Sequence, residues 1–69
     1  MKPEDVKLRE VLFEFHQVGQ AVRVVALDPI SGIEAIMVGA SGYGQETLKR
    51  LATQKLRYVI AKRHTASGK

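Results

Sequence analysis

The chain has 69 residues, of which 45% are hydrophobic, and it contains no cysteine. This length fits one domain, the composition is that of a folded domain rather than a disordered segment, and the lack of thiols excludes disulfide bonds and thiolate metal sites. The formal net charge is +4, but residues 1–44 carry four basic and six acidic side chains, whereas residues 45–69 carry seven basic and one acidic. We therefore expect a cationic C-terminal segment attached to a mildly acidic remainder.

The N-terminal segment, residues 1–9, has a weak helix signal. Pro3 and two acidic residues precede Lys7 and Arg9, which is the usual order of charges at a helix start, but the segment is too short to form a stable helix alone. We predict a loosely ordered segment or a short helix. The charged start differs from a signal peptide, and no window holds the ~18 apolar residues of a membrane span. These features predict a soluble cytoplasmic protein without membrane association.

The next predicted elements are two strands joined by a tight turn, residues 11–17 and 21–28. Apolar and polar residues alternate in the first segment, as in a strand with one buried face. Residues 18–19 (Val-Gly) have the composition of a two-residue turn, because glycine accepts the positive φ that such a turn requires. This turn would place Glu14 opposite Arg23, an opposite-charge pair across the two strands.

A third strand is predicted over residues 33–38. The loop before it, residues 29–32, begins with proline and ends with glycine, both of which favour a turn. This loop length would place Val25 opposite Ile36, and the three strands would form an antiparallel meander. One face of the meander collects the predicted core, which consists of Val11, Phe13, Phe15, Val22, Val24, Ala26, Ala35 and Met37.

The other face of this meander, the second sheet face, is more apolar than a solvent-exposed face normally is. Its polar residues Glu14, Arg23 and Glu34 only interrupt an apolar stripe, whereas an antiparallel sheet with one wet face usually alternates more cleanly. We expect either the N-terminal segment or another molecule to cover this face. The apolar residues expected on it are Leu12, Val25, Leu27, Ile36 and Val38, and the stripe is expected to align Leu12, Val25 and Ile36 across the strands.

Residues 45–63 are predicted to form one amphipathic helix that packs on the core face of the sheet. Its apolar residues recur at helical spacing, and Lys55, which falls among them, is expected to extend its ammonium group to the edge of the apolar stripe. Residues 64–69 show no periodicity and are predicted to be a disordered tail. The chain is thus predicted to be a single α+β domain over residues 1–63. The apolar helix residues are Leu48, Leu51, Ala52, Leu56, Val59 and Ile60.

The sequence holds no set of residues typical of an active site. Residues 39–44 lie between a strand and a helix, but they lack the glycine spacing of nucleotide-binding loops. His16 and His64 have no partner at metal-ligand spacing, and Ser31 and Ser41 are explained as turn and loop residues. We expect no catalytic residue, no metal, no cofactor and no enzymatic activity.

Four segments of the chain resemble the pattern of a known family. They are Phe13 to Gly19, Val22 to Val24, Asp28-Pro29 with Gly32, and the helix from Leu48 to Lys62. The resemblance covers roughly residues 10–63, and the family consists of short α-proteobacterial proteins classed as a domain of unknown function. It implies a β-β-β-α fold and supplies no activity, ligand or catalytic residue.

Two functions from different classes stay open, and we rank the first above the second. The first is a protein-interaction or adaptor module that self-associates, or binds a protein partner, through the second sheet face; small domains without disulfides often recruit a second copy. The second is nucleic-acid binding, because the expected element order also describes the double-stranded-RNA-binding domain.

The nucleic-acid hypothesis has a weakness in the last helix. The double-stranded-RNA-binding domain carries lysines in the first turn of that helix, where this chain has Gln45 and Glu46. The residues expected to contact phosphates, if the helix binds a polyanion, are Lys49, Arg50, Arg57, Lys62 and Arg63.

Overall fold

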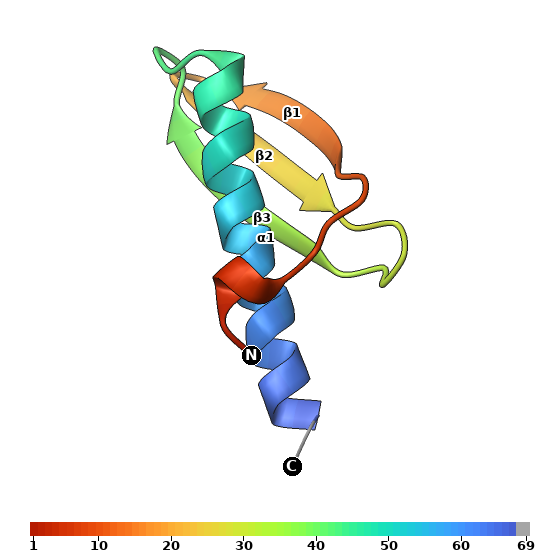
Figure 1. The fold of residues 1–69 in the computed structure, drawn as a ribbon. Helices are drawn as coiled ribbons and strands as arrows, with labels where there is room; N and C mark the ends of the chain where they lie inside the picture. The colour runs from red at the N-terminus through yellow and green to blue at the C-terminus, as the bar shows by residue number, and fades with distance from the viewer. Residues whose placement is uncertain (68–69) are drawn as a thin grey trace.

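The computed structural model describes the backbone of residues 1–67 and the side chains of residues 1–63. The three strands form one antiparallel sheet in the order β1-β2-β3, and helix α1 crosses one face of it (Figure 1). The predicted α+β fold with the order β-β-β-α is confirmed. The elements are η1 (Pro3–Asp5), β1 (Leu12–Val18), β2 (Ala21–Leu27), β3 (Glu34–Ala40) and α1 (Gln45–Ser67).

The core lies between α1 and the sheet. Leu48 and Leu56 from the helix and Val24 from β2 are the largest side chains that are fully buried. Burial of each such side chain contributes about 1.5–3 kcal/mol to folding. Three alanines share this cluster, and their small side chains let the helix approach β2 and β3 closely. The buried cluster is Val24, Ala26, Ala35, Leu48, Ala52 and Leu56, and the other predicted sheet-core residues pack around it half-buried.

The turn between β1 and β2 differs from the prediction. It consists of Gly19 and Gln20, because Val18 pairs with Ala21. Gly19 has a φ of 61°, and Gln20 does not have a positive φ. Glycine with positive φ at the first of two turn positions is the arrangement of a type II′ turn, whose twist matches that of the flanking strands.

This turn shifts the strand register by two residues. Glu14 lies opposite Val25, and His16 lies opposite Arg23, so the predicted pairing of Glu14 with Arg23 is wrong. A slip of two residues returns each side chain to its original face, because strand side chains alternate with a period of two. The predicted division of residues between the two sheet faces therefore holds.

The turn between β2 and β3 agrees with the prediction. Val25 lies opposite Ile36, and Asp28 N–H donates to the carbonyl of Ile33 at 2.9 Å, which closes a four-residue loop. The Asp28 carboxylate accepts a hydrogen bond from Ile30 N–H at 3.0 Å and one from Ser31 Oγ at 2.8 Å. These bonds give both carboxylate oxygens of the buried Asp28 a hydrogen-bond donor, and they stabilise the turn.

Helix α1 continues past its predicted end. It extends to Ser67, so the predicted disordered tail is wrong for residues 64–67; residues 68–69 lie outside the described part of the chain. Residues 45–67 contain no glycine or proline, and cations near the C-terminal end of a helix interact favourably with its dipole. Both features allow the helix to add turns beyond its last contact with the sheet.

The N-terminal segment includes the predicted short helix, η1, and packs on α1 rather than on the second sheet face (Figure 1). Val6 is buried, and its carbonyl accepts a hydrogen bond from Arg57 Nη1 at 2.6 Å. Within the described chain, the second sheet face is therefore not covered by the N-terminal segment.

One prediction concerns the first turn. Replacing Gly19 with alanine is expected to lower the free energy of unfolding by about 1 kcal/mol, because a Cβ disfavours positive φ. Urea denaturation measures this difference. Gly42→Ala is the matched control, since Gly42 has open space around it and does not have a positive φ. Equal stability of both variants would contradict the type II′ assignment.

Candidate interaction surface

The second sheet face carries all five of its predicted apolar residues, on the side of the sheet away from α1. Leu12, Ile36 and Val38 are 46%, 41% and 65% exposed, while Val25 and Leu27 are half-buried. Val18, 68% exposed, belongs to the same face. Val18 was not predicted to lie on this face, because the predicted turn included it.

The strand register arranges the second sheet face in four cross-strand rows. The predicted alignment of Leu12 with Val25 and Ile36 is wrong, because Leu12 lies one row away; the apolar patch runs diagonally. The charged residues occupy three of the four rows. From β1 to β3 the rows are Leu12–Leu27–Glu34, Glu14–Val25–Ile36, His16–Arg23–Val38 and Val18–Ala21–Ala40.

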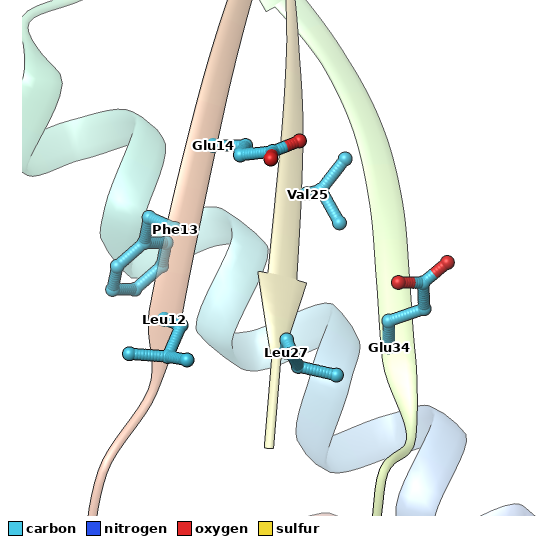
Figure 2. A pocket seen from close by; sticks show the side chains of 6 residues that line it. All are labelled: Leu12, Phe13, Glu14, Val25, Leu27 and Glu34. Carbon is cyan, nitrogen blue, oxygen red and sulfur yellow. The ribbon is translucent and has the colours of Figure 1, made fainter. Parts of the chain in front are cut away.

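A shallow hollow of about 320 Å³ lies at one end of this face. Figure 2 shows Glu14 extending from β1 across β2 and Glu34 standing on β3, with apolar side chains between them. The hollow thus combines an apolar floor with two carboxylates. Its lining residues are Leu12, Phe13, Glu14, Val25, Leu27 and Glu34.

Two of the four ionisable side chains of the second sheet face pair with each other, and the other two have no polar partner among the side chains of residues 1–63. Glu14 Oε1 lies 3.0 Å from His16 Nε2, in an exposed contact between residues two apart on β1. Arg23 and Glu34 are exposed and have no polar partner among the residues whose side chains are described. An approaching molecule would therefore meet Arg23 and Glu34 without having to break an existing ion pair.

The two edges of the sheet differ. Lys55 Nζ donates a hydrogen bond to the carbonyl of Ile36 on β3, which confirms that this lysine extends out of the apolar stripe. A lysine placed against an edge strand discourages further strand pairing. The outer edge of β1 has no such bond within residues 1–67.

The predicted polyanion-binding residues are not all available to a ligand, because several of them make contacts within the chain. Arg57 is half-buried and binds the Val6 carbonyl, Lys49 Nζ lies 5.7 Å from the centre of the Phe13 ring, and Lys62 Nζ lies 5.9 Å from that of Tyr58. Arg50 and Arg63 are exposed on α1, and Glu46 occupies its first turn. Contacts within the chain thus engage Arg57, Lys49 and Lys62.

The described residues also limit the possible chemistry. Among the residues whose placement is described, no group of three or more histidine and acidic side chains is arranged to hold a metal ion. No helix in that part of the chain has the length and apolar composition needed to cross a membrane.

The fold and this surface define a small α+β domain with one helix-covered and one open sheet face. The chain belongs to the family DUF6898, a domain of unknown function, which matches residues 8–63. That range includes all three strands and most of α1. Comparison with curated proteins and with solved structures gives no match.

Proposed function

We propose that this domain is a protein-interaction module that self-associates, and that a second copy covers its second sheet face. The observation that supports this proposal is the exposure of Leu12, Ile36 and Val38 on one continuous face. Contiguous apolar surface of this kind is costly in water and typical of binding sites. Contact with a second copy would remove this surface from water.

The position of the N-terminal segment strengthens the proposal. Either this segment or another molecule was expected to cover the second sheet face, and Arg57 instead holds the segment on α1 through the carbonyl of Val6. The remaining expectation is therefore another molecule. The role we propose is binding rather than catalysis, since the exposed Glu14–His16 contact is the one side-chain pair of acid and histidine in the described chain.

The substitution Val25→Glu tests the proposal. Val25 lies at the centre of the second sheet face opposite Glu14, so a carboxylate at position 25 would lose water in the assembly beside a second carboxylate. Light scattering coupled to size-exclusion chromatography is expected to give twice the chain mass for the wild type at high concentration. For Val25→Glu it is expected to give the monomer mass, with dimer affinity reduced at least about tenfold, or ~1.4 kcal/mol.

The control for this test is Gln54→Glu, which adds the same charge on an exposed position of α1. This variant is expected to dimerise like the wild type. A wild-type chain that stays monomeric at every concentration would contradict the proposal, and so would a Val25→Glu dimer of unchanged affinity.

Nucleic-acid binding through α1 stays a prediction. A duplex RNA titration followed by amide NMR is expected to place any salt-sensitive shifts near Arg50 rather than near the engaged Arg57. Shifts centred on Arg57 would show instead that RNA displaces its bond to Val6.

A further inference from the structure

We infer that the two copies are related by a two-fold axis that lies between the facing sheets, runs perpendicular to the strands and passes over β2 between Val25 and Arg23. This axis sets Glu14 of each copy against His16 and Arg23 of the other. The inference rests on the proposed self-association through the second sheet face and adds its geometry and its charge contacts.

Symmetry restricts the possible arrangements. A two-fold interface brings the same patch of both copies together, so the patch must be complementary to itself. For two sheets packed face to face with nearly aligned strands, the axis between them runs either parallel or perpendicular to the strands. Each axis brings different rows of the second sheet face into contact, so the residues in the four rows show which axis is favoured.

The parallel axis gives poor contacts. It sets each row on the same row of the second copy and exchanges the edge strands β1 and β3. Arg23 would then face Arg23 of the second copy, and Glu14 would face Ile36. Like charges in contact and a carboxylate buried against an apolar side chain both cost free energy. This arrangement is therefore disfavoured.

The perpendicular axis gives complementary contacts. It sets β2 over β2 and reverses the order of the rows, so the first row meets the fourth and the second meets the third. Three of the six facing pairs then join apolar residues, and Glu14 meets a histidine. The facing pairs are Leu12 with Val18, Leu27 with Ala21, Ile36 with Val38, Glu14 with His16, Arg23 with Val25, and, on the edge strand β3, Glu34 with Ala40.

Arg23 completes this arrangement. In the reversed order it lies over Val25 of the second copy, and the strand neighbour of Val25 on β1 is Glu14. Arg23 has no polar partner among the side chains of residues 1–63, and burial of an unpaired guanidinium would be strongly unfavourable. The carboxylate of Glu14 supplies the partner that lets the two faces close.

The size of the face predicts a reversible dimer. Three strands of seven residues give a surface of roughly 14 by 23 Å at normal strand spacing and rise. This footprint, roughly 320 Å² per copy, is below the ~800 Å² per partner of standard stable interfaces and is typical of a weak, transient contact. The dimer is therefore expected to depend on concentration, and its mass has to be followed over a dilution series.

The open edge of β1 offers a different dimer, in which two β1 strands pair antiparallel about Phe15. That dimer would also set Glu14 opposite His16 of the second copy, because the two residues are equidistant from Phe15. Arg23, on the central strand, would make no contact across such an edge. Substitutions at Arg23 therefore distinguish the two dimers.

The test uses two single variants, Arg23→Glu and Glu14→Arg, alone and mixed in equal amounts. In a homodimer of either variant, positions 14 and 23 of facing copies carry like charges, so each variant alone is expected to lose dimer affinity at least about tenfold. In the mixed dimer both contacts join opposite charges. Analytical ultracentrifugation of the mixture is expected to recover the dimer. Arg50→Glu, a charge reversal on the exposed side of α1, is expected to dimerise like the wild type.

The outcomes separate the inference from the proposal on which it rests. If the wild type dimerises, Val25→Glu does not, and the mixture stays monomeric, the axis is wrong and the second sheet face is still the interface. If Arg23→Glu alone dimerises like the wild type, the inferred contact is overturned. A monomeric wild type, or a dimer insensitive to Val25→Glu, overturns the proposal and the inference together.

Discussion

Replacing Leu56 with alanine is expected to lower the free energy of unfolding by about 2–5 kcal/mol. Leu56 is fully buried at the centre of the cluster between α1 and the sheet. Alanine removes apolar contacts and leaves a cavity that the surrounding backbone cannot fill, since α1 is held against both β2 and β3. A domain of this length has a total stability of roughly 3–10 kcal/mol, so the variant is expected to be close to unfolding at room temperature.

Urea denaturation followed by circular dichroism measures this effect. Leu51→Ala is the matched control, because Leu51 is on the same helix but only half-buried, and it is expected to lose less stability. An equal loss for Leu51→Ala and Leu56→Ala would contradict the assignment of Leu56 to the centre of the core.

The second large effect is expected for Arg57→Ala, with a loss of about 1.5–3 kcal/mol, the range for hydrogen bonds to charged groups. The guanidinium of Arg57 donates to the Val6 carbonyl at 2.6 Å and so joins two segments that are 51 residues apart in sequence. Its removal leaves the carbonyl of a buried residue without this donor. The N-terminal segment is then expected to separate from α1.

Hydrogen exchange at the Val6 amide reports this separation directly. That amide donates to the Pro3 carbonyl at 3.1 Å, and it is expected to exchange faster in Arg57→Ala than in the wild type. Arg50→Ala removes an exposed arginine from the same helix and is expected to change stability by less than about 0.5 kcal/mol. Unchanged protection of Val6 in Arg57→Ala would show that other contacts hold the segment.

Much of the fold could be predicted from the sequence because its signals are local. The spacing of Leu48, Ala52 and Leu56 predicts the buried side of α1, and all three residues are buried. The Asp28 turn was predictable because its proline and glycine occupy positions with defined φ preferences. The five apolar residues of the second sheet face were also predictable, since alternation along a strand determines the face.

The first hairpin shows where local signals are insufficient. A turn with Gly19 in its second position allowed Glu14 to face Arg23, and this pair favoured the predicted register. An exposed cross-strand ion pair contributes at most about 1 kcal/mol, whereas glycine in the first turn position permits a type II′ turn whose twist fits the strands. The geometry of the turn, and not the ion pair, therefore determines the strand register.

The contact between Arg57 and Val6 could not be predicted from helical periodicity. Arg57 lies outside the apolar stripe of α1, and that position is typical of a solvated cation. The helix pattern holds no information about a main-chain carbonyl 51 residues earlier. For the same reason, the predicted polyanion-binding set included a residue that the chain uses for its own packing.

The central claim is that a second copy covers the second sheet face. The most direct measurement is an isotope-filtered NOE experiment on a concentrated mixture of labelled and unlabelled chains, which detects contacts between copies alone. The inferred axis predicts contacts from the methyl groups of Ile36 to those of Val38 in the other copy. A concentrated sample without contacts between copies, or with contacts confined to Phe13 and Phe15 at the edge of β1, would contradict this account.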